Sequence, residues 1–157
     1  MSDYIPTLLK EFKLNTNTKI ALEQSAYLRN QFEFFGIKAT ERRALQQTFL
    51  AKDMLPTKNE LTTMVKELWK QPQRECQYFA QELAFKYLKQ IEIQDIQLYE
   101  YMVVNQSWWD TVDFIATKLL GAYFKKFPEQ KAIYVTKWLK SGNMWLQRCA
   151  LLFQLKI

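Results

Sequence analysis

Two aromatic and two acidic residues stand together in "NQSWWDTVDFIATKLL", residues 105–120. If this stretch is helical, one apolar stripe runs along it; its members are Trp108, Val112, Ile115 and Leu119. Ser107 and Asp110 fit a capping box and the first helical turn, where a carboxylate complements the helix dipole. Trp109 and Asp113 lie four residues apart on a neighbouring strip of the same helix, and capping explains neither.

A lone cation stands in the last apolar segment of the chain. From Met144 to Leu155, Arg148 is the only charged residue. It needs a partner or a groove, because an unpaired buried charge is very unfavourable. If the helices beginning near residues 108 and 144 lie side by side, Arg148 meets Trp109 and Asp113.

An indole, a carboxylate and a guanidinium in one cleft suit a cationic ligand or a cation-like transition state. The face of Trp109 attracts positive charge, and the carboxylate of Asp113 stabilises it at close range. Arg148 can hold a carboxylate or a phosphate. Spacing alone favours a plainer alternative, which is a structural ion pair between Asp113 and Arg148 beside a packing tryptophan.

The elements that would position these residues are helices. Helical periodicity dominates the chain, and with 3 Gly and 4 Pro the sequence is poor in turn residues. We predict an all-α protein, with starts marked by Thr40, by Thr57 with Glu60, and by Ser107 with Asp110. The predicted helices span residues 4–13, 17–31, 40–51, 57–70, 73–90, 94–103, 108–120, 122–127, 129–140 and 143–156.

Helices that begin near residues 40, 73, 108 and 144 recur at nearly constant spacing. Such a period is typical of an α-solenoid of the HEAT, armadillo or TPR type. We infer an α-α superhelix of divergent HEAT-like repeats forming one domain over residues 1–157, with an irregular helical bundle as the alternative. The sequence ends in an apolar helix, "MWLQRCALLFQLKI", without a polar cap. We therefore expect the domain to be truncated at its C-terminal end.

Composition narrows the possible functions. The net charge of +6 favours a polyanionic partner such as nucleic acid. The chain has no histidine, which excludes histidine-based acid–base catalysis and nearly all zinc sites. We expect no cofactor and no metal, because no phosphate-binding glycine loop or metal-ligating cluster is present. Cys76 and Cys149 are expected to be buried free thiols in a reducing cytoplasm.

We also expect neither a signal peptide nor a membrane span. The N-terminal stretch "MSDYIPTLLKEFKLN" lacks a basic segment followed by a long apolar one. No apolar run approaches the length of a transmembrane helix.

Four motifs resemble those of a known family. "SWWDTVD" and the later "NMWLQRCALLFQLK" are similar to segments of the bacterial DNA alkylation-repair glycosylases with HEAT-like repeats, the AlkD-like proteins. "SAYLRNQFEFFGIKATERR" at residues 25–43 and "ELWKQPQRECQ" at residues 67–77 also resemble family patterns. The resemblance runs in order through essentially the whole chain.

This resemblance implies hydrolysis of the N-glycosidic bond of cationic N3- and N7-alkylated purines, such as 3-methyladenine and 7-methylguanine, in double-stranded DNA. It implies that Asp113 is the catalytic carboxylate, that Trp109 approaches the deoxyribose, and that Arg148 completes the cleft and contacts the DNA backbone. It also implies excision without base flipping, in a monomeric, cytoplasmic, nucleoid-associated bacterial enzyme. Further DNA contacts are implied at Tyr27, Lys38, Arg43 and Lys156.

Two departures from the family pattern are visible. Lys38, Ala39 and Thr40 stand where the family often has a Thr-Pro pair, and family members continue beyond residue 157 with further repeats. Some relatives keep the fold without excision activity. A non-catalytic DNA-binding module and a protein-binding scaffold therefore remain alternatives to the glycosylase.

Overall fold

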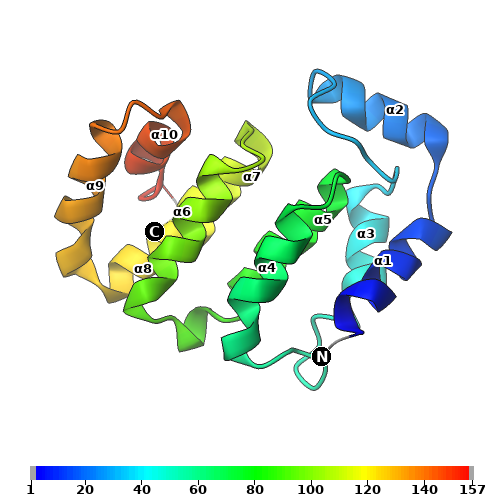
Figure 1. Ribbon diagram of the computed structural model, residues 1–157, viewed down its shortest axis with the longest axis horizontal. Helices are drawn as coiled ribbons and strands as arrows, with labels where there is room; N and C mark the ends of the chain where they lie inside the picture. Colours follow the sequence, from blue (N-terminus) through cyan, green and yellow to red (C-terminus); the bar gives the residue numbers. More distant parts are fainter. Residues whose placement is uncertain (1–2, 156–157) are drawn as a thin grey trace. The chain divides into compact units, whose positions relative to one another are not determined.

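The computed structural model describes residues 3–155. Two compact units divide the chain, Met1–Leu83 and Ala84–Ile157, and each is described by itself. Within residues 3–155 the secondary structure is helical, apart from an isolated parallel bridge between Glu33 and Gln73 (Figure 1). The predicted all-α fold of helical repeats is confirmed, while the prediction of a single domain over residues 1–157 stays a prediction.

The first unit contains four helices and the greater part of a fifth. They are α1 (Tyr4–Leu14), α2 (Thr18–Tyr27), α3 (Ala39–Gln46), α4 (Leu61–Trp69) and α5 (Arg74–Phe85), which crosses into the second unit. A 3-10 turn, Lys58–Glu60, leads into α4. The predicted capping box of Thr57 and Glu60 at this turn is confirmed.

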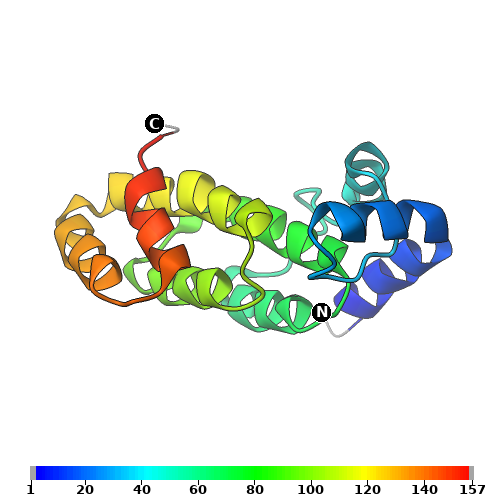
Figure 2. The ribbon, with the colours of Figure 1, turned by 90° about the horizontal axis from the view of Figure 1, so that it is seen from above.

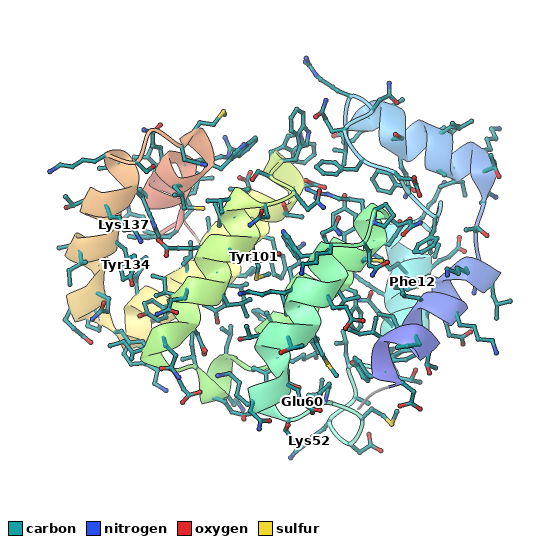
Figure 3. The ribbon with its side chains drawn as sticks, viewed as in Figure 1. Phe12, Lys52, Glu60, Tyr101, Tyr134 and Lys137 are labelled. Carbon is teal, nitrogen blue, oxygen red and sulfur yellow. The ribbon has the colours of Figure 1, made fainter. Side chains whose placement is uncertain are left out.

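Apolar residues at helical spacing form the core of the first unit. Helix α4 buries Leu61, Met64, Val65, Leu68 and Trp69, the spacing of one helix face. Helix α1 packs on α3 and buries Phe12, whose ring lies 5.8 Å from that of Phe35 (Figure 3). Each such fully buried side chain stabilises the fold by about 1.5–3 kcal/mol.

The second unit is built around one long helix. Helix α7 (Trp109–Phe114), a π-helical segment (Ile115–Leu120) and α8 (Gly121–Lys126) follow one another without a break. Around them lie α6 (Ile96–Val104), α9 (Lys131–Leu139) and α10 (Met144–Leu152) (Figure 2). Three 3-10 turns connect these helices: Leu88–Gln90, Ile93–Asp95 and Pro128–Gln130.

The long helix turns its apolar stripe into the core of the second unit. Val112, Ile115 and Leu119 are fully buried, as predicted, whereas Trp108 is only half-buried. Helix α10 packs against α6, α7, α9 and the π-helical segment. Trp138 on α9 is fully buried, and its indole N–H donates to Glu100 at 2.7 Å. Lys137 lies beside Trp138 in sequence and pairs with the same carboxylate at 3.1 Å, with the ring of Tyr134 below its ammonium (Figure 3).

The predicted period is sharper in the structure than in the sequence. Helices α3, α5, α7 and α10 begin at Ala39, Arg74, Trp109 and Met144, so each start follows the previous one by 35 residues. Every interval contains at least one further helix. This regular spacing means that residues 35 apart occupy the same register in successive repeats.

Most predicted helices are found within a few residues of their expected bounds, but two details were wrong. The predicted break near residue 121 does not exist, because Gly121 continues the helix and donates its N–H to the carbonyl of Ala116, five residues back. The predicted second helix is shorter, since Arg29 and Asn30 adopt left-handed backbone angles that end it. Within residues 3–155, no helix has the length and apolarity needed to cross a membrane.

Candidate functional site

The start of α7 differs from the sequence prediction. Trp108, with extended backbone, is the N-cap residue, and no side chain caps the helix. The predicted capping box of Ser107 and Asp110 is wrong, because the Ser107 hydroxyl donates instead to the carbonyl of Val103 in the preceding helix. Asp110 does lie in the first turn, where it accepts the N–H of Thr111 at 3.0 Å.

Asp113 and Arg148 form a side-on, two-point ion pair. The Nε of Arg148 donates to Oδ1 of Asp113 at 2.5 Å, and Nη2 donates to Oδ2 at 2.8 Å. The pair is accessible, since the side chains are 36% and 43% exposed for Asp113 and Arg148. The hydrogen bonds from Asp113 raise the pKa of Arg148, so the guanidinium is permanently charged.

This geometry leaves both partners with unused capacity. A carboxylate has about four lone-pair sites and a guanidinium has five N–H donors. The side-on pair uses one site on each oxygen of Asp113 and two donors of Arg148. The pair can therefore accept a water or a cation at Asp113 and donate to an anion from Arg148 without separating.

Two contacts fix Arg148 opposite Asp113. The side chain of Asn143 caps α10 by accepting the N–H groups of Trp145 and Leu146, at 2.9 and 3.1 Å. The ring of Trp145 lies 6.0 Å from that of Trp108. These contacts tie the first turn of α10 to the first turn of α7, one turn before the ion pair.

Trp109 presents its indole beside the ion pair along α7. It stands one helical turn before Asp113 and is 40% exposed, which is unusual for so large an apolar side chain. Its partner in the "WW" pair, Trp108, packs on Trp145 instead. The division of roles between the two tryptophans therefore follows the prediction, with Trp108 packed and Trp109 accessible.

Gly121 allows the long helix to approach α10. A Cβ atom at this position would lie 2.8 Å from the carbonyl oxygen of Phe153, just beyond α10. π-helical segments often occur at functional sites, and this one begins two residues after Asp113. Thr117 lies within it and donates its hydroxyl to the carbonyl of Asp113 at 2.8 Å.

The remaining predicted site residues belong to the first unit or lie outside the described residues. Tyr27, at the end of α2, is 74% exposed, and Lys38 and Arg43, before and within α3, are exposed. Lys156 lies outside the described residues. The structure therefore brings Trp109, Asp113 and Arg148 together in one unit and does not place the other four against them.

A buried carboxylate holds the loop that precedes Lys38. Glu75 is fully buried and accepts the N–H groups of Phe35, Gly36 and Ile37, at 2.9, 3.1 and 3.1 Å. Gly36 has φ of +96°, and a Cβ there would lie 2.0 Å from the carbonyl of Asn17. Only glycine fits this crossing, so Glu75 and Gly36 together fix the loop.

Sequence reasoning missed Glu75, Asn143 and Thr117. Each one acts through a backbone group that is not visible in a side-chain pattern. An isolated glycine inside a helical pattern was the one available signal, since it often marks a close backbone approach. At Gly121 that signal was interpreted as a helix end.

Neither cysteine is available for chemistry at neutral pH. Cys76 and Cys149 are free thiols and fully buried, as predicted. Burial raises the pKa of each thiol to about 12. Within the part of the chain that the structure describes, no three His, Cys, Asp or Glu side chains gather in a group able to hold a metal ion.

Comparisons with known proteins agree on one family. The model of the DNA alkylation repair enzyme family matches residues 8–157. A solved structure, described as a predicted DNA alkylation repair enzyme from Enterococcus faecalis, is 28% identical with a TM-score of 0.80. The match covers 89% of this chain and 65% of the Enterococcus protein. No curated protein matches the sequence.

Proposed function

The chain belongs to the DNA alkylation repair enzyme family, and we propose that it is a DNA glycosylase for cationic alkylated purines. Its substrates are N3- and N7-alkylated purines in double-stranded DNA, such as 3-methyladenine and 7-methylguanine. The reaction is hydrolysis of the N-glycosidic bond. The observation that carries the proposal is the accessible ion pair of Asp113 and Arg148 beside an exposed Trp109.

A cationic purine suits a site without a general acid. An alkylated purine already carries positive charge, so it departs as a neutral base without being protonated. The chain has no histidine to act as an acid. What the protein must supply is stabilisation of the positive charge that develops on the deoxyribose, and a water to attack it.

Each residue of the site has a role in this reaction. Asp113 stabilises the oxocarbenium-like sugar and orients the attacking water through the lone pairs that Arg148 leaves unused. Trp109 offers its aromatic face to the sugar and the cationic base. Arg148 holds the carboxylate and donates its remaining N–H groups to a phosphate of the DNA backbone.

The wider binding surface follows from charge. A net charge of +6 favours duplex DNA, and we assign backbone contacts to Tyr27, Lys38, Arg43 and Lys156. We propose that the lesion is excised without being flipped into a deep pocket, in contrast to most glycosylases. We further propose HEAT-like repeats, a monomeric state and a cytoplasmic, nucleoid-associated location.

The test is release of methylated bases from duplex DNA treated with a methylating agent. The full chain is expected to release 7-methylguanine or 3-methyladenine, and Asp113→Asn is expected to lower the rate at least about 100-fold. Asp110→Asn, which removes the same charge three residues earlier, serves as the control and keeps most of the rate. An unchanged rate in Asp113→Asn would remove Asp113 from the reaction.

A non-catalytic DNA-binding module is the second candidate. It is favoured by one observation, which is that both oxygens of Asp113 already accept from Arg148. This candidate predicts salt-sensitive DNA binding with no base release at any protein concentration. Trp109→Ala and Trp109→Phe add a further comparison, because the glycosylase requires an aromatic ring there and retains activity only with Phe.

A further inference from the structure

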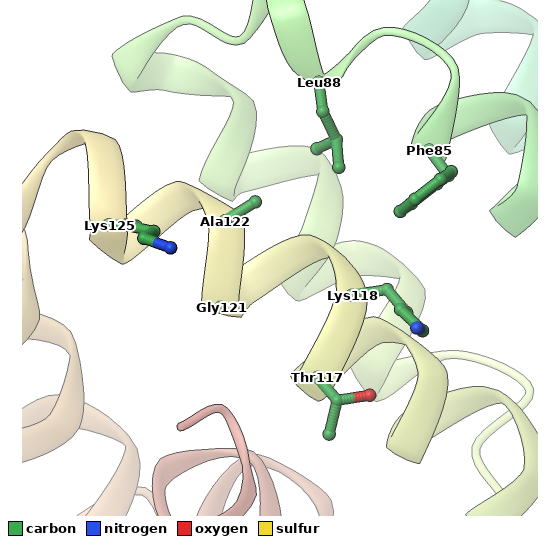
Figure 4. Close-up of a pocket in the computed structure, with 7 residues that line it drawn as sticks. All are labelled: Phe85, Leu88, Thr117, Lys118, Gly121, Ala122 and Lys125. Carbon is green, nitrogen blue, oxygen red and sulfur yellow. The ribbon is translucent and has the colours of Figure 1, made fainter. Parts of the chain in front are cut away.

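A second concave feature lies on the same long helix as Asp113. It is a pocket of about 260 Å³ in the second unit (Figure 4). One wall comes from the π-helical segment and α8, and the other from the end of α5 and the following turn. The lining residues are Phe85, Leu88, Thr117, Lys118, Gly121, Ala122 and Lys125.

The pocket has a cationic rim and an apolar floor. Lys118 and Lys125 lie toward its two ends with Ala122 between them, and Phe85 and Leu88 face them from the other wall (Figure 4). None of the lining residues is acidic. Among residues 3–155, no carboxylate forms an ion pair with Lys118 or Lys125. The two ammonium groups thus provide positive charge that the described part of the chain does not neutralise.

The apolar floor indicates what kind of anion fits. Phe85 is 43% exposed, and its outer edge is steadied by an edge-to-face contact with Phe114, at 6.3 Å between ring centres. A small inorganic anion has no use for an aromatic ring and a leucine. A sugar-phosphate strand presents both groups, with phosphate oxygens for the lysines and the apolar face of the deoxyribose for Phe85 and Leu88.

The pocket is aligned with the candidate catalytic residues. Thr117 lines the pocket and also donates to the carbonyl of Asp113 at 2.8 Å. Along the helix axis, Lys118 and Lys125 lie about 7.5 and 18 Å beyond Asp113, at 1.5 Å per residue. A strand whose lesion lies at Asp113 can therefore continue along the helix into this pocket.

We propose that this pocket binds the phosphodiester backbone of the DNA strand that flanks the lesion. Lys118 and Lys125 each hold one phosphate, and Phe85 and Leu88 contact the sugar between them. The inference rests on the proposed DNA substrate, but it does not require base excision. It assigns a function to residues that stand outside the cleft of Trp109, Asp113 and Arg148.

The test is the salt dependence of binding to undamaged duplex DNA. Affinity of the full chain for a short fluorescent duplex is measured by anisotropy between about 50 and 200 mM salt. Lys118→Gln/Lys125→Gln is expected to lower the slope of log K against log salt by about 1.8, at 0.9 for each phosphate lost. Lys131→Gln/Lys140→Gln on α9 removes the same charge from exposed positions outside the pocket and serves as the control.

A second variant tests the pocket without removing a lysine. Ala122→Glu places a carboxylate between the two ammonium groups on a helix that tolerates it, and it is expected to weaken DNA binding at least as much as the double lysine variant. A slope for the lysine variant equal to that of the control would overturn the proposal.

A third arm separates DNA from a free nucleotide. Binding of deoxyadenosine monophosphate is measured by calorimetry on the full chain and on the Lys118→Gln/Lys125→Gln variant. Loss of mononucleotide binding with an unchanged DNA slope would overturn the proposal in favour of a nucleotide site. Normal slopes with no base release from methylated DNA would instead reject the glycosylase and leave the pocket assignment intact.

Discussion

Asp113 and Arg148 lie 35 residues apart, which is the spacing between the starts of α7 and α10. Each is the fifth residue of its helix, so the ion pair joins the same register position in two successive repeats. Neighbouring helices in such an array place equivalent positions side by side. The opposite charges at one shared position therefore form the cleft that Trp109 borders.

The first prediction concerns the shape of the Arg148 side chain. Arg148→Lys keeps the charge but replaces a planar fork with a single ammonium, which cannot hold both oxygens of Asp113. We expect base release to fall at least about tenfold in Arg148→Lys and further in Arg148→Ala. The unfolding free energy should change by less than about 1 kcal/mol, because the pair is exposed.

Two measurements separate this role from a structural one. Base release and urea unfolding are compared for both Arg148 variants, with Lys140→Ala as an equal loss of charge elsewhere. A large loss of stability with normal base release per folded molecule would show that the ion pair is structural.

The second prediction concerns Gly121. Replacing a helical glycine with alanine usually stabilises a protein by about 0.5–1 kcal/mol. Here the new Cβ meets the carbonyl oxygen of Phe153 at 2.8 Å, which is backbone that cannot rotate away. We expect Gly121→Ala to lower the unfolding free energy by about 1–3 kcal/mol, and to lower base release because α10 carries Arg148 away from Asp113.

Chemical denaturation checks the sign of this effect. Ala122→Gly, at the next position, serves as the control and should lose no more than about 1 kcal/mol from helix propensity. A gain of stability in Gly121→Ala would mean that α10 moves away without cost, contrary to the prediction.

Several features of the fold and the site were accessible from sequence. The 3.6-residue period separated Trp109 and Asp113 from the apolar stripe of Val112, Ile115 and Leu119, and the structure has the same separation. The recurrence of helix starts placed Arg148 opposite Asp113. Both inferences need only local geometry and a constant repeat length, which side-chain patterns record.

Other features depend on contacts that no local pattern records. The pocket requires Phe85 to lie near Lys125, and the cap of α10 requires the side chain of Asn143 to fold back on its own helix. The helix start at Trp108 was missed because Ser107 donates to Val103 in the preceding helix. Hydrogen bonds to backbone atoms of another segment override the local capping preference in such cases.

The third prediction concerns the loop before Lys38. Glu75→Ala removes the acceptor of three backbone N–H groups in a site without water access, and each unsatisfied group costs about 1–3 kcal/mol. We expect the unfolding free energy to fall by roughly 3 kcal/mol or more. Glu75→Gln keeps one acceptor oxygen and should fall in between.

The control for Glu75 is an exposed glutamate in the same unit. Glu67→Ala on α4 should change the unfolding free energy by no more than about 0.5 kcal/mol. Equal stabilities for the Glu75 and Glu67 variants, measured by urea unfolding, would contradict the proposed anchoring of the loop.

The last prediction concerns pH and the two buried thiols. Burial raises the pKa of Cys76 and Cys149 from 9.0 to about 12 in the folded chain. The unfolded chain therefore loses these protons from about pH 9 upward while the folded chain keeps them, and stability falls between pH 9 and 12. Below pH 9 both states are protonated, so the thiols do not affect the pH dependence there.

Thiol labelling and thermal unfolding check this prediction together. Ellman's reagent at pH 8 should leave both thiols of the native chain unmodified and label both in guanidinium chloride. Between pH 9 and 11 the melting temperature should fall more steeply for the parent chain than for Cys76→Ala/Cys149→Ala, because each buried thiol accounts for up to one proton released on unfolding. Tyr123, whose pKa is also raised to about 12 by burial, remains in both proteins and sets the residual slope. Identical slopes, or rapid labelling of the native chain, would show that the thiols are accessible and ionise normally in the folded state.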